Sequence, residues 1–277
     1  MDIRDYIRLA LAEDVGDGDH TSLSTIPRAA ERRARLLVKE DGIVAGVEVA
    51  KIIFEEVDPL LEVEIFIRDG QVIKKGDIVL HVSGDAQAIL KAERLVLNTM
   101  QRMSGIATYT HSLVSLLDGL STRLLDTRKT TPNFRLFEKM AVKIGGAVNH
   151  RYALYDMILI KDNHVDYAGG IEAALSQARA YLKRTGRQLQ IEIEVRNLSE
   201  LEQVLQIGNI DRIMLDNFSL DDLRTAVQRV AGKYPTEASG GIREETLRAV
   251  AETGVDYISC GALTHQIKSL DLSLKAY

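Results

Sequence analysis

The sequence has one cysteine, no tryptophan, four prolines and no long apolar run, and these shortages exclude several classes of protein. With Cys260 as the sole cysteine, an internal disulfide and a multi-cysteine zinc or iron–sulfur site are both excluded. No apolar run approaches the roughly 20 residues that a membrane-spanning helix needs. The low proline content and a hydrophobic fraction of 45% also differ from the composition of disordered or collagen-like chains.

An excess of positive charge is missing too, because 40 acidic residues outnumber 35 basic ones. A general nucleic-acid-binding surface requires such an excess, so we expect no nucleic-acid partner, and any anion must bind to a local cluster of cations. Residues 2–11 have charges and one apolar helical face, which predicts a docking helix rather than a signal peptide. We therefore expect a cytoplasmic protein with no membrane partner.

Several catalytic motifs are also missing, namely HExxH, the Walker glycine–lysine loop and the GxSxG elbow. The acidic segment that starts at Asp14 resembles a calcium loop, but Thr25 stands where the bidentate glutamate should be. We interpret this segment as a tight loop. His111 and His265 lie in apolar helical contexts and are expected to be structural.

The first third of the chain mixes strand and helix patterns. Residues 35–39 and 62–67 alternate like strands, and residues 68–84 resemble a hairpin followed by a strand. Residues 46–57 are typical of a helix. Together they predict a small α/β domain. A helical pattern over residues 86–120, interrupted near Ser104 and Gly105, then leads to a second domain.

The rest of the chain repeats an apolar run that ends in polar residues or glycine. The six runs are residues 123–129, 157–164, 191–195, 212–217, 236–241 and 257–262. Amphipathic helical stretches such as 171–182 and 220–230 lie between them. Strands that alternate with helices predict a parallel α/β barrel, in which functional groups gather at the carboxyl ends of the strands.

Adjacent cations, Arg128 and Lys129, follow the first of these runs directly. With Arg151, Lys161 and the neighbouring His150, they predict a pocket for a small ligand with several negative charges, because arginine recognises carboxylates and phosphates in a bidentate manner. The alternatives are a basic surface turn at Arg128 and Lys129, and ion pairs of Arg151 and Lys161 with Asp156 or Asp162.

Two carboxylates, Glu194 and Asp216, end successive strands. Carboxylates with substrate phosphates are sufficient ligands for Mg²⁺, although structural pairing with Arg196 is the alternative. We expect Glu192 to point to the opposite face of its strand from the core-facing neighbours, and we assign it no role.

Two short glycine segments, 239–242 and 259–262, each precede a helical stretch. Backbone amides at a helix N-terminus bind phosphate, and the last two units of an α/β barrel are a common place for such a site. A tight strand-to-helix turn is the alternative.

Residues 126–165, DTRKTTPNFRLFEKMAVKIGGAVNHRYALYDMILIKDNHV, resemble the quinolinate phosphoribosyltransferase family, also called carboxylating nicotinate-nucleotide pyrophosphorylases. The resemblance extends through nearly the whole chain and includes LAEDVGDGDHTS, ERLVLNTMQRMSGIAT, IEIEV, IMLDN, EASGGI and ISCGALTH. One departure is Asn133, where the family usually has glycine. Since asparagine tolerates the left-handed conformation, we expect this turn to survive.

The resemblance implies an α/β fold of the type II phosphoribosyltransferase class. It places an α/β sandwich domain with a linking helix at residues 1–110 and an incomplete α/β barrel at 111–265. Residues 266–277 would form a C-terminal segment that returns to the first domain.

The resemblance also implies a set of substrate-binding residues. They are Arg94, Thr127, Arg128, Lys129, His150, Arg151, Lys161, Glu194, Asp216, Ser239, Gly240, Gly241, Ser259, Cys260 and Gly261. The family's dicarboxylate site falls on Arg128, Lys129, His150 and Arg151, and Arg94 would enter from the neighbouring subunit of a homodimer. Arg94 belongs to a polar stripe in the helical stretch 86–103, together with Asn98, Gln101 and Arg102.

The family's site for phosphoribosyl pyrophosphate and Mg²⁺ falls on Lys161, Glu194, Asp216 and the loops 239–241 and 259–261. Lys129, Lys161, Glu194 and Asp216 would be catalytic, and Glu194 and Asp216 would bind the metal. The implied reaction transfers phosphoribosyl to quinolinate with decarboxylation and gives nicotinate mononucleotide, pyrophosphate and CO2, a step of de novo NAD biosynthesis. Mg²⁺ is the one cofactor expected, and His150 and Lys129 are both candidate proton donors.

Other functions remain open at this point. A paralogous enzyme could act on nicotinate or another small acid, or be a pyrophosphorylase associated with molybdenum transport. A Schiff-base aldolase could use Lys161. A carrier role for residues 72–82 is the least favoured, because the methionine–lysine tip of lipoyl and biotinyl carriers is missing.

Overall fold

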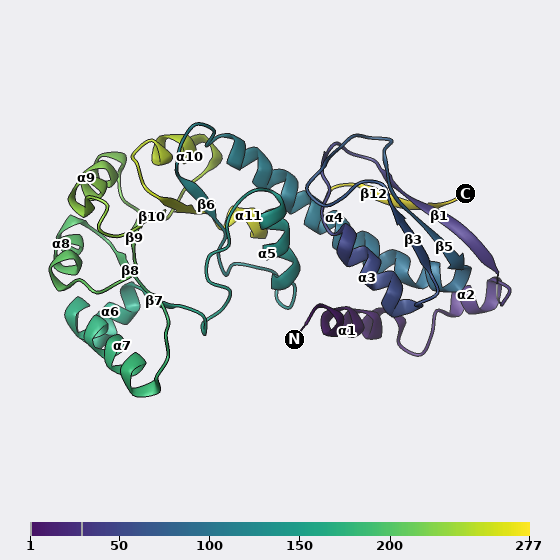
Figure 1. The fold of residues 1–277 in the computed structure, drawn as a ribbon, viewed down its shortest axis with the longest axis horizontal. Coiled ribbons are helices and arrows are strands. Elements are labelled where there is room, and N and C mark those ends of the chain that lie inside the picture. Colours follow the sequence, from purple (N-terminus) through teal and green to yellow (C-terminus); the bar gives the residue numbers. More distant parts are fainter. Residues whose placement is uncertain (1, 29) are drawn as a thin grey trace. The chain divides into compact units, whose positions relative to one another are not determined.

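The computed structural model describes residues 2–28 and 30–277 and divides into two compact units (Figure 1). Unit 1 comprises the described residues up to His111, together with Thr130–Gly146 and Ala262–Tyr277. Unit 2 comprises Ser112–Lys129 and Ala147–Gly261. Residues 130–146, which the sequence places inside the barrel domain, therefore cluster with unit 1.

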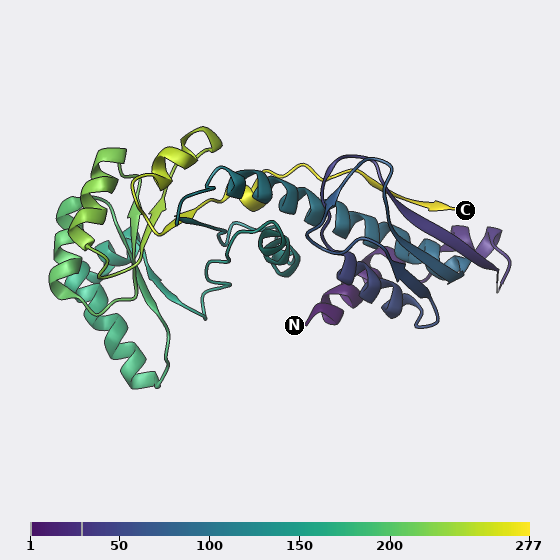
Figure 2. The ribbon, with the colours of Figure 1, turned by 45° about the horizontal axis from the view of Figure 1, so that its top comes forward.

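Unit 1 is built on an antiparallel sheet of order β12-β1-β5-β3 (Figure 2). Its strands are Glu31–Val38 (β1), Glu62–Ile65 (β3), Ile78–Asp85 (β5) and Leu272–Ala276 (β12). A separate short ladder joins β2 (Gly42–Ile43) to β4 (Val72–Ile73). The hairpin expected within residues 68–84 is thus wrong, because the long β5 pairs with β1 and β3 whereas the two-residue β4 pairs with β2.

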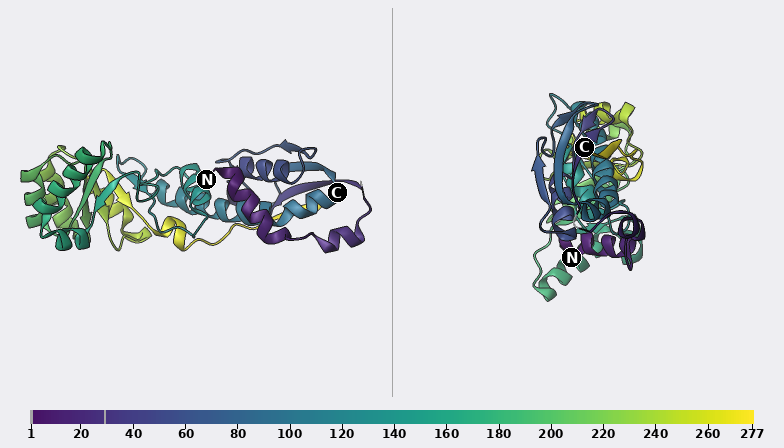
Figure 3. Two further views of the ribbon diagram at one scale, coloured as in Figure 1. Left: turned by 90° about the horizontal axis from the view of Figure 1, so that it is seen from below. Right: turned by 90° about the vertical axis from the view of Figure 1, so that its right-hand side faces the viewer.

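The helices of unit 1 start with α1 (Ile3–Val15), α2 (His20–Thr25) and α3 (Val47–Val57). Figure 3 shows α1 beside α3, and Arg4 and Arg8 of α1 pair with Glu56 of α3. The acidic segment is a short turn followed by α2, and Asp19 caps this helix by accepting a hydrogen bond from the amide of Ser22 at 3.1 Å.

Helix α4 (Ala86–Ser115) runs without interruption through Ser104 and Gly105, so the expected break is wrong. The Ser104 hydroxyl accepts a hydrogen bond from the amide of Ala45 at 2.9 Å. Gly105 lets the backbone of Lys268 approach so closely that a side chain would collide with its carbonyl oxygen. Both residues therefore serve packing and do not end the helix. In the described part of the chain, no helix is both long and apolar enough to cross a bilayer.

Two further helices complete unit 1, α5 (Arg135–Ile144) and the short α11 (Ala262–His265). The turn before α5 contains Asn133 at φ 60°, in the left-handed region. The expectation that asparagine accommodates this turn is therefore confirmed.

Unit 2 contains one parallel sheet of order β6-β11-β10-β9-β8-β7. Its strands are Arg123–Leu125 (β6), Ile158–Ile160 (β7), Ile191–Val195 (β8), Arg212–Asp216 (β9), Thr236–Ser239 (β10) and Tyr257–Ser259 (β11). All six strands expected from the sequence are confirmed. In the described sheet, β6 and β7 are the edge strands, so the barrel is incomplete.

Helices cover the outer face of this sheet (Figures 1 and 2). They are α6 (Asp162–Ala168), α7 (Ile171–Thr185), α8 (Leu198–Ile207), α9 (Leu220–Val230) and α10 (Glu244–Ala251). Ile191, Ile193 and Val195 of β8 alternate with Glu192 and Glu194, and all five are buried. Because successive side chains of a strand point to opposite faces, the two glutamates share one face, the side on which functional groups gather.

Candidate active site

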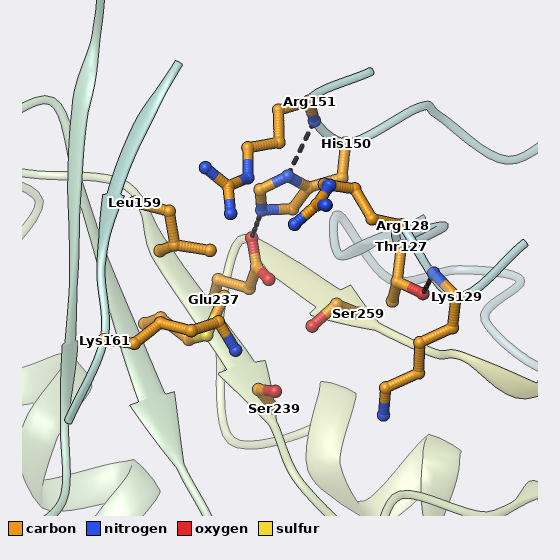
Figure 4. A pocket seen from close by; sticks show the side chains of 11 residues that line it. Thr127, Arg128, Lys129, His150, Arg151, Leu159, Lys161, Glu237, Ser239 and Ser259 are labelled. Atoms are coloured by element: carbon orange, nitrogen blue, oxygen red, sulfur yellow. Dashed lines mark hydrogen bonds and ion pairs between the residues drawn. The ribbon is translucent and has the colours of Figure 1, made fainter. Parts of the chain in front are cut away.

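A cavity of about 300 Å³ lies among the strands of unit 2 (Figure 4). It is lined by Thr127, Arg128, Lys129, His150, Arg151, Leu159, Lys161, Met214, Glu237, Ser239 and Ser259. The structure thus brings together eight of the predicted site residues. Figure 4 shows Arg128, His150 and Arg151 at one end of the cavity, with Ser239 toward the other.

The two guanidinium groups form the most basic part of this cavity. Burial lowers the pKa of Arg151 below its ordinary value, and the positive charge of Arg128 lowers it further. The negative charges of Glu192 and Asp156 act in the opposite direction and raise this pKa. Arg151 donates a hydrogen bond to the carbonyl oxygen of Met157 at 3.1 Å, whereas the carboxylate of Asp156 accepts from two amides of its own turn. A bound carboxylate or phosphate would relieve the repulsion between the two arginines.

Lys161 directly follows β7, and Glu194 lies on the neighbouring strand β8, with Nζ of Lys161 3.5 Å from Oε2 of Glu194. Burial raises the pKa of Glu194; Lys161 opposes this shift, and the charges of Asp216 and Asp162 add to it. Lys161 thus pairs with Glu194, whereas the alternative considered from the sequence was an ion pair with Asp162. Arg196 pairs instead with Glu200 and Asp166, at 2.6 and 3.3 Å.

Glu194 and Asp216 suit a hard divalent cation. They supply carboxylate oxygens from adjacent strands; burial raises the pKa of Glu194, and repulsion by the negative charge of Asp216 adds to this shift. A cation such as Mg²⁺ between them would remove that repulsion, and waters and substrate phosphates can complete its shell. The residues present therefore fit the metal expected from the sequence.

Asn217 is a functional candidate that the sequence analysis missed. Its side-chain amide donates a hydrogen bond to Oδ2 of Asp216 at 2.7 Å, and its backbone amide donates to Ser239 at 2.9 Å. Its own φ is 56°, and a Cβ at Gly240 would collide with its side chain. Asn217 thus orients a predicted metal ligand and requires glycine in the neighbouring loop; the signal was its place after Asp216 in the segment IMLDN.

The two glycine segments lie at the ends of β10 and β11. Gly240 and Gly241 have φ of 89° and 60°, conformations that favour glycine. Ser239 and Ser259 line the cavity, whereas Cys260 is buried and its amide donates to the carbonyl of Leu125 at 2.9 Å. Segment 239–241 leads into α10, which is long enough to form a helix N-terminus, whereas α11 has four residues.

A buried charged cluster below the arginines was also missed. Nε2 of His150 lies 3.1 Å from Oε2 of Glu192 and 3.3 Å from Oε2 of Glu237, and Nη1 of Arg212 lies 3.0 Å from the same oxygen of Glu237. Both glutamates are fully buried. Glu192 points to the opposite face of β8 from Ile191 and Ile193, as expected, but this is the face of Glu194, so assigning it no role was the error; its strand parity with Glu194 was the available signal.

The charges of this cluster shift one another's pKa values. Burial lowers the pKa of His150, but the hydrogen bonds and charges of Glu192 and Glu237 outweigh it and raise the pKa to about 9. Burial and the charge of Glu237 raise the pKa of Glu192. Burial also acts to raise the pKa of Glu237, but His150, Ser259 and Arg212 bring it below its ordinary value.

Both nitrogens of the His150 ring contact protein groups. Nδ1 accepts a hydrogen bond from the amide of Arg151 at 2.6 Å, while Nε2 faces the two carboxylates. The backbone amide of His150 donates to Oδ1 of Asp126 at 2.8 Å. The contact at Nδ1 favours the neutral ring with its hydrogen on Nε2. It therefore opposes protonation of Nδ1, whereas the two carboxylates favour the protonated, positively charged ring.

Arg94 lies on an exposed face of α4 in unit 1. The stripe expected around it is only partly exposed. Gln101 donates to the carbonyl of Leu272 at 2.8 Å, and Arg102 pairs with the buried Glu138 at 2.8 Å. Arg94 and Asn98 are the exposed members of the stripe.

Comparisons with known proteins agree with this architecture. Family models of the N-terminal and C-terminal domains of quinolinate phosphoribosyl transferase match residues 19–104 and 106–275. The chain is 46% identical to quinolinate phosphoribosyltransferase [decarboxylating] 1b of Nicotiana tabacum, over 99% of this chain and 82% of the relative. It is 42% identical to a probable nicotinate-nucleotide pyrophosphorylase [carboxylating] of Bacillus subtilis, over 95% of this chain and 89% of the relative.

A solved structure gives the same result. The crystal structure of NadC from Streptococcus pyogenes superposes with a TM-score of 0.93 at 38% identity, covering 99% of this chain and 95% of that one. The fold, the cavity with its paired arginines and the matches over both domains lead to one conclusion: this chain belongs to the quinolinate phosphoribosyltransferase family.

Proposed function

We propose that this protein transfers the phosphoribosyl group of phosphoribosyl pyrophosphate to quinolinate and decarboxylates the product to nicotinate mononucleotide. One observation carries the proposal: the paired guanidinium groups of Arg128 and Arg151 share one cavity with Lys161, which contacts Glu194. Quinolinate has two carboxylates for the cations, and the sugar donor has phosphates that need Mg²⁺. The names of the relatives support this assignment.

The chain's own residues would act chiefly by alignment. Arg128 and Arg151 hold the two carboxylates of quinolinate and so fix the direction of its ring nitrogen. This nitrogen forms a bond to C1 of the ribose while the bond from C1 to the pyrophosphate oxygen breaks. Lys161 and the amides after Ser239 hold phosphate oxygens, and Mg²⁺, when bound at Glu194 and Asp216, neutralises charge on the pyrophosphate.

Decarboxylation follows from the charge of the ribosylated ring. The bond between C2 and its carboxylate breaks, CO2 leaves, and the electron pair that stays on C2 is stabilised by the adjacent cationic nitrogen. A proton then adds to C2. Lys129 lines the cavity and is exposed, which makes it the favoured donor.

The direct test is product analysis with quinolinate, phosphoribosyl pyrophosphate and Mg²⁺. We expect nicotinate mononucleotide, pyrophosphate and CO2 in equal amounts. Reaction with nicotinate but not with quinolinate would assign the chain to a monocarboxylate paralogue and reject the proposal. Reduction with borohydride should trap no substrate on Lys161, because the reaction forms no Schiff base.

Arg94 belongs to the proposal as a residue that serves the partner's site in a homodimer. Its exposure on α4 is compatible with this role. Arg94→Ala and Arg128→Ala should each be nearly inactive alone. After random subunit exchange about half of the dimers are mixed, and each mixed dimer has one intact site, so activity should return to about a quarter of wild type. Exchange without recovery would reject the shared site. A cytoplasmic location stays a prediction.

A further inference from the structure

The buried cluster of His150, Glu192, Glu237 and Arg212 has no assigned part in the reaction above. Glu192 and Glu237 are fully buried, and among the described residues neither carboxylate oxygen of Glu192 has a hydrogen-bond partner, nor does Oε1 of Glu237. Removing carboxylates from water is costly unless other groups compensate, and His150 and Arg212 provide positive or hydrogen-bonding partners here. An arrangement this costly at the base of a cavity calls for a functional reason.

From this geometry we infer that Glu192 and Glu237 are positioning residues, which hold the His150 ring with its Nε2 atom directed toward the two carboxylates. In this position His150 shapes the quinolinate end of the cavity and donates no proton to the product. The inference rests on the proposed function.

The contacts of the ring support the first half of this inference. Nε2 lies 3.1 and 3.3 Å from the carboxylates of β8 and β10, and Nδ1 accepts from the amide of Arg151 at 2.6 Å. Both nitrogens are engaged by the protein, so the ring offers its face and carbon edges to a ligand. A flat apolar surface suits an aromatic ring such as that of quinolinate.

The same contacts connect the cluster to the arginine pair. The amide that reaches Nδ1 belongs to Arg151, whose guanidinium is held by Met157 at 3.1 Å. Asp126, directly before Thr127 and Arg128, accepts from the amide of His150 at 2.8 Å. A shift of the His150 ring would therefore release the amide of Arg151, and a shift of the His150 backbone would disturb Asp126 close to Arg128, which is why the cluster should affect quinolinate binding.

A metal ion is the alternative occupant of this cluster. Potential ligand atoms of His150, Glu192 and Glu237 all lie within 4.8 Å of one another. Against a metal, Oε2 of Glu237 faces Nη1 of Arg212 at 3.0 Å, so a bound cation would lie next to a guanidinium. Nε2 of His150, 3.1 and 3.3 Å from the two carboxylates, interacts with the same atoms without that repulsion.

The test compares substitutions that keep or remove the hydrogen bond at Nε2. In His150→Gln the amide nitrogen can replace Nε2 as a donor to the carboxylates, but it cannot transfer a proton. We expect its kcat to fall less than about tenfold, whereas loss of a general acid costs roughly 10²–10⁴-fold. His150→Leu removes the donor, and its KM for quinolinate should rise by at least about tenfold. A fall of kcat in His150→Gln by a hundredfold or more would overturn the inference.

Substitutions of Glu192 test the inference independently. Glu192→Gln keeps an acceptor for Nε2, and its kcat/KM for quinolinate should stay within about threefold of wild type. Glu192→Leu removes the acceptor and should raise the KM for quinolinate about tenfold or more, with the KM for phosphoribosyl pyrophosphate within about twofold. Equal changes of both KM values would indicate general structural damage and contradict positioning.

Two controls separate the possible failures. If wild type forms no nicotinate mononucleotide from quinolinate, the proposed function fails, whatever the variants do. If wild type is active, elemental analysis of the purified protein decides about the metal. Stoichiometric zinc or another transition metal that disappears in Glu192→Leu would replace the hydrogen-bonded arrangement by a metal site and overturn the inference.

Discussion

Unit 1 and unit 2 each bury carboxylates completely, but they compensate them differently. In unit 1, Oε1 of Glu138 accepts from Nε and Nη2 of Arg102 at 3.1 and 2.8 Å and from the Thr131 hydroxyl at 2.9 Å, and Oε2 accepts from the Thr131 amide at 3.0 Å. In unit 2, Glu192 and Glu237 share one imidazole nitrogen. A fully satisfied carboxylate organises a fold, whereas a partly satisfied pair is typical of a site where function offsets the cost.

The largest expected effect concerns the third arrangement of carboxylates, Glu194 with Asp216. The double variant Glu194→Gln, Asp216→Asn should lose more than about a thousandfold in kcat/KM and most of its response to Mg²⁺, with its fold intact. Titration of activity with Mg²⁺ and circular dichroism measure the two properties. An unchanged Mg²⁺ titration would place the metal ligands elsewhere.

The next largest effect is expected on the stability of the fold, at Glu138 of unit 1. Glu138→Ala leaves Arg102 half-buried without its carboxylate, so the free energy of unfolding should fall by about 3–5 kcal/mol, the usual cost of breaking a buried pair. Urea unfolding measures this loss. The matched control is Glu192→Gln, which keeps the shape and a polar group at its buried position and should therefore lose less stability than Glu138→Ala. Equal losses in both variants would remove the distinction between the two kinds of carboxylate.

The raised pKa of His150 predicts a pH effect of intermediate size. Because the folded-state pKa is about 9 and the ordinary value is 6.5, the stabilisation is fully present below pH 6.5 and disappears as the pH rises to about 9. The free energy of unfolding should fall by up to about 3 kcal/mol over this window. Urea unfolding of wild type and His150→Gln isolates the contribution of His150. Parallel pH curves for the two proteins would show that the ring is neutral throughout.

The effect with the smallest lower limit, about tenfold, is expected at the arginines, with a change that keeps the charge. Lysine at position 128 or 151 cannot form a bidentate pair with a carboxylate, so kcat/KM for quinolinate should fall about tenfold to a thousandfold. Steady-state kinetics measure this loss, and Arg196→Lys is the control, since Arg196 pairs outside the cavity. A change below about twofold at both positions would make them surface residues.

The sequence was sufficient for the strands of unit 2 and for the cations after them, because hydrophobic runs and their polar ends follow a local period. It was insufficient for Glu192 and Glu237. In a barrel the inner face of a strand can be polar and buried, so residue type no longer indicates which face is inside. Strand parity with Glu194 identifies Glu192, but Glu237 requires the register between β9 and β10.

Non-local packing explains the other errors. Gly105 has the local signature of a break, yet the close approach of Lys268, more than 150 positions later in the chain, keeps it inside α4. Asn217 acts through a contact with Gly240 that no short segment contains. Pairing of β4 with β2 instead of β5 likewise depends on segments that the turn between β4 and β5 does not specify.

Strand β12 has a consequence for how the protein is made. It follows all of unit 2 in the chain and pairs with β1 over residues 272–276 and 34–38. During synthesis on the ribosome, β1 therefore keeps an unpaired edge until the whole of unit 2 has been translated. At roughly 5–20 residues per second this interval lasts about ten seconds or more, long enough for an exposed edge to pair with another nascent chain or to recruit a chaperone.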